Sequence, residues 1–334
     1  MRIGQGFVLS ACDGHASAGP VRWCMTATPS LIALDWGTSS LRALLLDGAG
    51  NVIESRTEPW GLMHLPGGDF GASFHAVTTP WCAHTPGLPA IAAGMVGSAQ
   101  GWVHAPYCPA PAGAEELAKA MMRVPGVDLS VVPGISTCAE RPDVMRGEET
   151  QVVGALEAHP ALAADSLVIL PGTHSKWVRV TEGRVGDFTT YITGELFAVL
   201  RDHSILGRFA IGADGASDRS AMDDAFARGV RTAHASGKGL APLLFSARSF
   251  VLAHQLPADA SLEYLSGLLI GDEMRCGLAG GRRPAALIGD PRLCGRYVAA
   301  LQLVGIDDIP VIGGAAERGL WSIALRAGLV ARAS

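Results

Sequence analysis

Apolar and polar positions follow the same order at two places in the chain. In residues 31–47 an apolar run leads into the turn Gly37-Thr-Ser-Ser, and a second, alternating run follows it. Residues 167–180 repeat this order around Gly172-Thr-His-Ser. Short apolar runs that are bounded by turn residues predict β-strands. We therefore expect one strand–turn–strand unit built twice, with the two copies far apart in the sequence.

The rest of the pattern predicts strands and helices in turn. Strands are expected at residues 31–36, 42–47, 51–58, 127–133, 184–192 and 285–289, and a buried strand that runs into a glycine-rich loop at 88–98. Helices are expected at residues 114–123, 148–159, 195–202, 262–276, 294–304 and 315–329. Because the strand pattern restarts, we predict two lobes, residues 25–150 and 151–334, each with one copy of the repeated unit.

The first 24 residues fit neither lobe. They carry Gly, Ser, His and Pro without any period, and the apolar stretch that begins at Phe7 is too short for the core of a signal peptide. Met25 leads almost directly into the first predicted strand. We expect residues 1–24 to be a loose tail, or translation to begin at Met25.

Composition narrows the class of protein. Of 334 residues, 49% are hydrophobic and 17% are charged, which is typical of a well-packed chain. The net charge of −5 and the absence of a basic stripe argue against nucleic acid or an anionic membrane as a partner. No apolar run is long enough to cross a membrane. The seven cysteines include no C-x-x-C pair, which predicts reduced thiols, no zinc site and a cytoplasmic location.

The two repeated turns have the chemistry of phosphate-binding loops. Small residues leave backbone N–H groups and hydroxyls free to face an anion, so two such turns predict two lobes that hold one polyphosphate. The candidate phosphate ligands are Gly37, Thr38, Ser39 and Arg42 in the first unit and Gly172, Thr173 and His174 in the second. In the second run His174 and Lys176 are expected to share one face of the strand and Trp177 to point to the other.

Asp35 ends the first buried strand, where a carboxylate is costly without a partner. A hydrated Mg²⁺ that bridges ATP phosphates would be such a partner. The alternative is a hairpin in which the aspartate caps its own turn. The second copy of the turn favours the first interpretation.

Two adjacent acids, Glu148 and Glu149, begin the helix predicted at residues 148–159. Acids in the first turn of a helix are usually solvated and are favoured by the helix dipole. The alternative is that one carboxylate is the base that takes a proton from a substrate hydroxyl, beside both phosphate loops.

Further polar motifs suit a small-molecule site. The candidate substrate residues are Gly94, Met95, Ser98, Gln100, Trp102 and Arg146. This mixture of glycine, hydroxyl, amide and aromatic groups suits a polyol pocket. The alternative for the Trp102 ring is that it packs at the edge of a core. Gly289 and Asp290, at the end of a predicted strand, are candidates for seating an adenosine, but glycine is common at such junctions for packing reasons.

Taken together, these motifs resemble one family, that of the 2-dehydro-3-deoxygalactonokinases. The residues that carry the resemblance stand at 35–40, 94–102, 105–107, 143–151, 170–178, 193–197 and 264–271 and so span most of the chain after Met25. The sequences Arg146-Gly-Glu-Glu-Thr-Gln and Pro171-Gly-Thr-His-Ser-Lys-Trp are the most specific of them, since phosphate loops alone occur in many kinases.

The resemblance implies an α/β fold of two ribonuclease-H-like lobes, the actin-like ATPase fold, with mixed sheets flanked by helices and a cleft between the lobes. It implies transfer of the ATP γ-phosphate to the 6-hydroxyl of 2-dehydro-3-deoxy-D-galactonate with Mg²⁺, in D-galactonate catabolism. Asp35 would then organise the metal. Comparison with the more distant glycerol and xylulose kinases places the base at Glu148, and its neighbour Glu149 stays an alternative.

Three other functions are kept as alternatives. One is a kinase for the gluconate-derived epimer of the sugar acid, because one hydroxyl distinguishes the two substrates. Another is a non-kinase ATPase of the actin and Hsp70 type, and the third is a sugar-responsive regulator that binds without catalysis. The expected partners are a sugar acid and ATP, and a homo-oligomer is compatible with the sequence.

Overall fold

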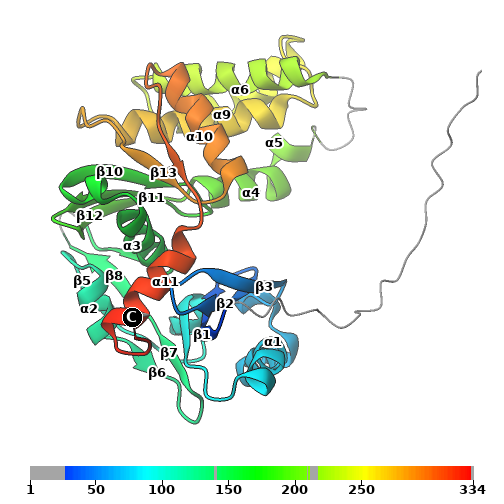
Figure 1. Ribbon diagram of the computed structural model, residues 1–334. Helices are drawn as coiled ribbons and strands as arrows, with labels where there is room; N and C mark the ends of the chain where they lie inside the picture. Colours follow the sequence, from blue (N-terminus) through cyan, green and yellow to red (C-terminus); the bar gives the residue numbers. More distant parts are fainter. Residues whose placement is uncertain (1–26, 139–140, 209, 211–216, 332–334) are drawn as a thin grey trace, which may run out of the picture.

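The computed structural model describes residues 27–138, 141–208, 210 and 217–331, which form two lobes stacked one on the other (Figure 1). The first lobe holds a six-stranded sheet in the order β3-β2-β1-β4-β7-β6. Its strands are β1 (Pro29–Trp36), β2 (Leu41–Asp47), β3 (Val52–Glu58), β4 (Ala90–Gly94), β6 (Met122–Arg123) and β7 (Leu129–Val131). Strands β1 to β3 form an antiparallel meander, and β4 pairs in parallel with β1.

The second lobe repeats this topology in a five-stranded sheet, ordered β12-β11-β10-β13-β14. Its strands are β10 (Asp165–Leu170), β11 (Ser175–Thr181), β12 (Arg184–Tyr191), β13 (Ala286–Ile288) and β14 (Val311–Ile312). Again three consecutive strands form an antiparallel meander and a later strand pairs in parallel with the first of them. The duplicated unit is therefore confirmed, and each lobe has the ribonuclease-H-like strand order.

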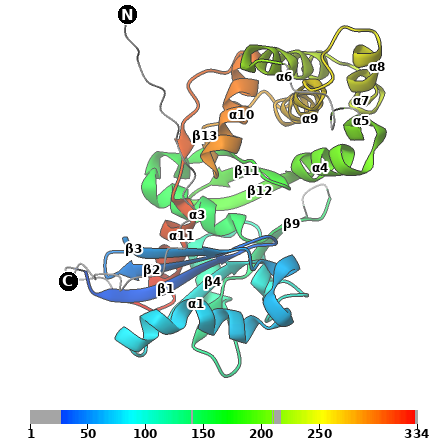
Figure 2. The same cartoon turned by 90° about the vertical axis from the view of Figure 1, so that its right-hand side faces the viewer.

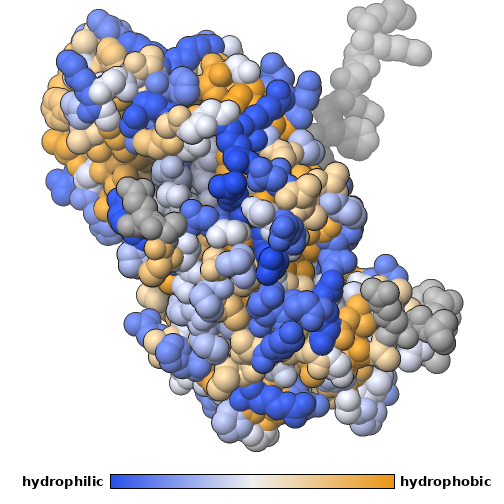
Figure 3. Space-filling view, turned by 90° about the vertical axis from the view of Figure 1, so that its left-hand side faces the viewer, coloured by the Kyte–Doolittle hydropathy of each residue, from blue (hydrophilic) through white to orange (hydrophobic). Residues whose placement is uncertain are grey.

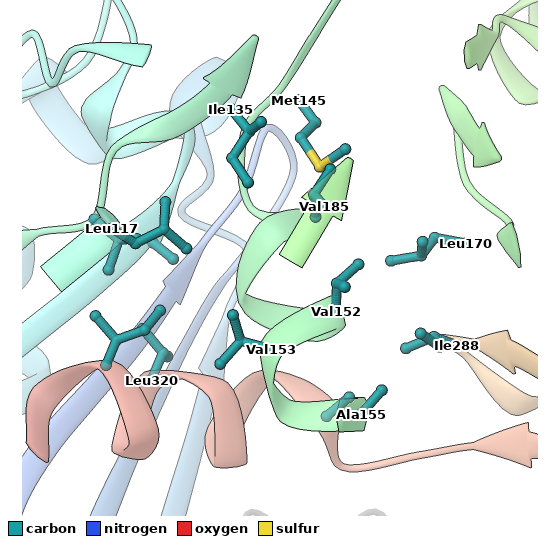
Figure 4. Close-up of a cluster of buried hydrophobic side chains, with 14 of the residues drawn as sticks. Leu117, Ile135, Met145, Val152, Val153, Ala155, Leu170, Val185, Ile288 and Leu320 are labelled. Carbon is teal, nitrogen blue, oxygen red and sulfur yellow. The ribbon is translucent and has the colours of Figure 1, made fainter. Parts of the chain in front are cut away.

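Two helices lie between the sheets and join the lobes. They are α3 (Glu148–Ala158) and α11 (Ala315–Arg326). The two helices cross so closely that a Cβ on Gly154 would stand 1.8 Å from the Ala315 carbonyl oxygen. In Figure 4, Val152 of α3 points toward the second-lobe residues Leu170 and Ile288, while Val153 points toward Leu320 of α11. One buried cluster thus contains residues of both sheets and of both helices.

The remaining helices cover the outer faces. Helix α1 (Phe70–His84) packs on the first lobe. The helices of the second lobe are α4 (Thr193–His203), α5 (Ile205–Arg208), α6 (Arg219–His234), α7 (Ala241–Leu244), α8 (Ser246–Leu252), α9 (Ser261–Gly277) and α10 (Pro291–Leu303). In the view of Figure 2, most helices of the second lobe lie above its sheet, and α4 lies beside β11 and β12. Helices α6 and α9 also pack closely, since a Cβ on Gly229 would stand 2.2 Å from the Tyr264 carbonyl oxygen.

A small third sheet was not predicted from the sequence. Strands β5 (Tyr107–Pro109), β8 (Gly134–Thr137) and β9 (Asp143–Met145) are too short to show a period. This sheet lies against β12 of the second lobe, where the Asp143 carboxylate accepts hydrogen bonds from the backbone N–H and the hydroxyl of Thr190, both at 2.7 Å. It therefore links the two lobes on one side.

Most predicted elements are confirmed, with differences at their ends. The helix expected at 114–123 is wrong beyond Lys119, because α2 (Ala114–Lys119) stops there and Met122–Arg123 pair with β7 instead. Helix α10 begins at Pro291, earlier than expected, because the Asp290 carboxylate accepts from the N–H groups of Arg292 and Leu293 and caps the first turn. The predictions for residues 1–24 lie outside the described residues.

The polar surface and the free cysteines are as expected from the composition. Figure 3 shows hydrophilic residues spread over both lobes on one face of the molecule. Within the described part of the chain, no helix is both long enough and apolar enough to span a bilayer. The cysteines of that part, Cys82, Cys108, Cys138, Cys276 and Cys294, are all free thiols.

Candidate active site

The first turn is tight and open to solvent. The backbone N–H of Gly37 donates to the Ser40 carbonyl oxygen at 3.0 Å, which closes the turn between β1 and β2. Thr38 and Ser39 are exposed. Behind them the chain packs closely at Gly61, whose Cβ would stand 2.4 Å from the backbone of Ser39. The hydroxyls therefore face outward, while the backbone of the turn is fixed from behind.

Charged groups surround the strand end before this turn. Asp35 is half-buried and pairs across the hairpin with Arg42. Burial raises the pKa of the Asp35 carboxyl; Arg42 opposes this effect, and the nearby carboxylates Glu148 and Glu317 add to it. Arg42 in turn forms an ion pair of 3.3 Å with Glu317 of α11. The first turn is thereby connected electrostatically to both of the helices between the lobes.

The second turn lies under the start of α4. A Cβ on Gly194 would stand 2.6 Å from the Gly172 carbonyl oxygen, and the Glu195 N–H donates to the Thr173 carbonyl oxygen at 3.0 Å. The His174 ring bonds to the Glu195 carboxylate. His174 precedes β11, so the strand alternation expected for it does not apply, whereas Lys176 and Trp177 do lie in that strand.

A buried carboxylate holds the elements on both sides of this turn. Glu273 of α9 is 2% exposed. It accepts hydrogen bonds from Ser175, Trp177, Thr193 and Tyr297, that is, from β11, α4 and α10. Burial raises the pKa of Glu273, and the hydrogen bonds oppose that effect. Sequence patterns did not indicate this network, because its members come from elements that lie far apart along the chain.

The two adjacent acids at the start of α3 have opposite environments. The side chain of Glu148 is 24% exposed, its Oε1 lies 3.5 Å from the Lys176 ammonium, and its Oε2 accepts from the Arg146 N–H at 3.1 Å. Glu149 is fully buried and both of its oxygens accept from the Gly147 N–H. Burial, reinforced by the charge of Glu148, raises the pKa of Glu149 to about 8.

The backbone before α3 explains how Glu148 reaches the end of the first sheet. Gly147 has a φ of +108°, and its Cβ would stand 3.4 Å from the Cα of Gly94. Gly94, in turn, ends β4 beside Trp36 of β1. This close glycine contact places the start of α3 next to the strand that carries Asp35.

A cavity of about 340 Å³ collects residues of both lobes. Asp35 and Arg42 line it from the first lobe, and the predicted adenosine residues Gly289 and Asp290 line it from the second. Glu317 also lines it, and the Oε2 atom of Glu317 is buried without a hydrogen-bond partner among the described residues. The predicted metal residue, one phosphate ligand and the predicted adenosine residues thus meet at one cavity.

A second cavity, of about 280 Å³, lies beside the second turn. Gly172 and Gly194 line one end of it, and helices α4, α9 and α10 form its walls. Its polar groups include Glu263, Ser266 and Arg296, joined by an ion pair of 2.8 Å and a hydrogen bond of 2.7 Å. Sequence reasoning missed these residues, because three separate helices contribute to the pocket and none carries a motif for it.

The predicted substrate residues fall into different settings. Ser98 Oγ and the Nε and Nη1 atoms of Arg146 are buried without hydrogen-bond partners in the described chain. The Arg146 Nη2 donates to the Ala105 carbonyl oxygen at 2.8 Å. Trp102, by contrast, packs in the core of the first lobe, where its ring stacks on Phe70 with centroids 6.1 Å apart.

The other predicted substrate residues are less informative. Met95 is half-buried in a short 3-10 helix, and Gln100 is exposed in the loop that follows it. The packing of Trp102 supports the core alternative for that residue. Ser98 and Arg146 are left as the polar groups with unused hydrogen-bonding capacity.

No group of three or more His, Cys, Asp or Glu side chains that could hold a metal ion occurs among the residues that the structure describes. Asp35 and Glu317 nevertheless provide carboxylate oxygens at one cavity. Such a pair suits a metal that arrives with a ligand and keeps part of its own water shell.

Comparison with known proteins identifies the family. Residues 35–323 match the family described as 2-keto-3-deoxy-galactonokinase. The chain belongs to the 2-dehydro-3-deoxygalactonokinase family. The matched range begins at Asp35 and includes every residue of the candidate site described above.

Individual members of the 2-dehydro-3-deoxygalactonokinase family are similar over almost their full length. The 2-dehydro-3-deoxygalactonokinase of Escherichia coli (strain K12) is 37% identical over 304 residues, which cover 89% of this chain and 98% of that protein. A probable 2-dehydro-3-deoxygalactonokinase of Rhizobium meliloti (strain 1021) is 38% identical over 312 residues, covering 91% and 99%. A crystal structure of a Sinorhizobium meliloti protein assigned to the same activity superposes with a TM-score of 0.79 at 35% identity, covering 88% and 98%.

Proposed function

We propose that this member of the 2-dehydro-3-deoxygalactonokinase family transfers the γ-phosphoryl group of ATP to the 6-hydroxyl of 2-dehydro-3-deoxy-D-galactonate. The observation that carries the proposal is the placement of Glu148. The charge of this half-buried carboxylate raises the pKa of Asp35 in the first lobe, and the carboxylate forms an ion pair with Lys176 of the second lobe. Glu148 thus lies near residues that flank both Gly-Thr turns. A base in that place can reach an acceptor hydroxyl beside the phosphates.

ATP would bind mainly to the second lobe. The adenosine would occupy the cavity of about 280 Å³ between α4, α9 and α10, which Gly172 lines. Gly289 and Asp290, predicted from the sequence to seat the adenosine, line the other cavity and would instead lie beside the phosphates. The phosphates of ATP would then pass along the second turn toward the cavity of about 340 Å³, where Arg42 of the first lobe can meet them. Phosphoryl transfer asks little covalent chemistry of the protein, so positioning and charge supply most of the rate.

Glu148 is the proposed base, and Glu149 is assigned no contact with substrate. Glu148 keeps one oxygen oriented by the Arg146 N–H, and its side chain remains accessible. Glu149 is buried, with a pKa raised to about 8, so it is largely protonated at neutral pH and cannot accept a proton there. The two acids that sequence reasoning could not separate thus differ by environment.

Mg²⁺ is part of the proposal, with Asp35 and Glu317 as the residues that would hold it. Mg²⁺ is commonly bound by one or two carboxylates together with substrate phosphates and water. The unpartnered Oε2 of Glu317 and the half-buried carboxylate of Asp35 fit this need. The metal would neutralise charge that develops on the phosphates during transfer.

The sugar acid would bind on the side of the first lobe. Its carboxylate needs a cation, and the Nε and Nη1 groups of Arg146 are donors without partners in the described chain. Gly97, in the glycine-rich loop, lies against the Arg146 guanidinium. The next residue, Ser98, therefore offers a hydroxyl near the same place. The alternative substrate, the gluconate-derived epimer, is not favoured, because the matching family and both curated relatives are named for the galactonate-derived acid.

A coupled assay of ADP release tests the function. The purified protein is supplied with ATP and Mg²⁺, first alone and then with each of the two epimeric 2-dehydro-3-deoxy acids. We expect release that depends on the sugar acid and is faster with the galactonate-derived epimer. ADP release without any acceptor would favour an ATPase, and a preference for the other epimer would change the substrate.

A further inference from the structure

Lys176 is a buried cation that the proposed mechanism has not yet used. The lysines of the chain are Lys119, Lys176 and Lys238. Lys119 and Lys238 are exposed, whereas the side chain of Lys176 is only 5% exposed. Burying an ammonium group is costly unless charge or hydrogen bonds compensate. A lysine at this one interior place therefore needs an explanation.

The position of Lys176 in the sheet directs it toward the site. Lys176 pairs with Leu170, the last residue of β10, so it stands immediately after the second turn. Its neighbours Ser175 and Trp177 both donate to Glu273 on one side of β11. Because side chains alternate across a strand, Lys176 projects to the opposite side, where its ammonium lies 3.5 Å from Glu148 Oε1.

That ion pair leaves donors unused. An ammonium group has three N–H donors. Among the residues that the structure describes, Glu148 is the charged partner of Lys176. Glu148 also acts on the carboxyl of Asp35, which Arg42 and Glu317 influence as well, so the partner of Lys176 belongs to the charged group at the end of the first strand. The ammonium is thus paired with the proposed base, on a strand that begins directly after the second turn.

We propose that Lys176 is a catalytic residue that binds the γ-phosphoryl group of ATP and stabilises it during transfer. The inference rests on the proposed function. Lys176 would contact a γ-phosphoryl oxygen with a free donor while still orienting Glu148. A compact ammonium is suited to this task because it is a point charge with rotatable donors, unlike the planar fork of arginine.

The transfer step leaves the protonation state of Lys176 unchanged. The 6-hydroxyl oxygen forms a bond to the γ-phosphorus as the bond from that phosphorus to the β–γ bridging oxygen breaks. The hydroxyl proton passes to Glu148, and the electron pair of the broken bond stays on ADP. Lys176 keeps its proton throughout and interacts only with the oxygens that ADP lacks.

This difference between ATP and ADP gives the test. Lys176→Met keeps the length and burial of the side chain and removes its charge. We expect kcat to fall roughly 10²–10³-fold, as on loss of one transition-state donor. We also expect weaker binding of the non-hydrolysable analogue AMP-PNP, with the Kd for ADP within about twofold of the original protein. Calorimetric titration with each nucleotide measures both affinities.

Two further variants keep the test decisive. Lys238→Met is the matched control, because Lys238 is exposed and lies outside the site. Lys176→Arg preserves the charge and should recover part of the lost AMP-PNP affinity, and it replaces Lys176→Met if that variant does not fold. Equal losses of ADP and AMP-PNP affinity would show a merely structural lysine and overturn the inference. Unchanged kcat would do the same, whereas failure of the proposed function would appear as absent sugar-dependent ADP release in the original protein.

Discussion

The two Gly-Thr turns share a strand geometry but have different surroundings. The first turn, 37–40, is exposed and is backed by the segment at Gly61. The second turn, 171–174, lies under the start of α4, and Glu273 ties together the elements on both sides of it. Both turns have exposed residues, Thr38 and Ser39 in the first and Thr173 and His174 in the second, but the first is held by one neighbouring segment and the second by α4 and the elements that Glu273 joins.

The charges beside the turns differ in the same way. The first turn has a carboxylate on its own strand, Asp35, with Arg42 opposite it. The second turn has the apolar Leu170 at the corresponding strand end, and its carboxylate, Glu148, comes from α3. Repetition of the backbone therefore does not mean repetition of the task. We assign metal and phosphate binding to the first turn, and nucleotide positioning and proton removal to the surroundings of the second.

The strongest loss of activity should separate Glu148, the acid beside the second turn, from its neighbour Glu149. Glu148→Gln should lower kcat about 10²–10⁴-fold, the usual loss on removing a general base, while the affinity for ATP changes little. Steady-state kinetics with a nucleotide titration measure the two effects. Glu149→Gln is the matched comparison, because it makes the same change at a buried position. A larger loss of kcat in Glu149→Gln than in Glu148→Gln would show that the base is misassigned.

An intermediate effect compares how firmly the turns are held. Alanine at Gly194 places a Cβ 2.6 Å from the Gly172 carbonyl oxygen, and alanine at Gly61 places one 2.4 Å from Ser39. Overpacking of this kind costs about 1–3 kcal/mol. Because the start of α4 is also bonded to the buried Glu273 through Thr193, we expect Gly194→Ala to lower the free energy of unfolding more than Gly61→Ala, and to raise KM for ATP about tenfold.

Chemical denaturation and ATP kinetics measure this pair of variants. Gly237→Ala is the control, since no atom lies within 4 Å of its added Cβ. Equal losses of stability at Gly61 and Gly194 would mean that the two turns are held alike. The contrast drawn between them would then be wrong.

The last comparison concerns pH and Glu149, the buried acid of the pair at the start of α3. The pKa of Glu149 is raised from 4.5 to about 8, so between these values the folded chain keeps a proton that the unfolded chain releases. Its contribution to stability is fully present below pH 4.5 and is lost as pH rises toward 8, with a slope of at most about 1.4 kcal/mol per pH unit. Glu149→Gln should remove this component.

Denaturation of the original protein and of Glu149→Gln at pH 5 and pH 8 measures the slope. The variant should gain stability relative to the original protein as the pH rises. A constant difference between the two proteins across this range would contradict the raised pKa. This result would also weaken the contrast between Glu148 and Glu149.

Local sequence patterns were enough to find both turns and most of the elements around them. Apolar runs bounded by glycine correctly placed β1, β2, β10 and β11, because strand formation at a buried sheet depends on such runs. The short strands of the third sheet were missed, since three or four residues cannot show a period. The predicted helix at 114–123 is longer than α2, because helical propensity continues into residues that pair with β7.

The residues of the site show the same difference between what local sequence indicates and what folding adds. Local sequence was sufficient to identify the residue types of the site: the two Gly-Thr turns, Asp35, the acid pair and the lysine after the second turn. Folding was needed to show which of the adjacent acids stays accessible, that Glu273 joins the elements beside the second turn, and that α4, α9 and α10 form a pocket. Turn and strand chemistry depends on near neighbours along the chain, whereas burial and charge pairing depend on residues that only folding brings together.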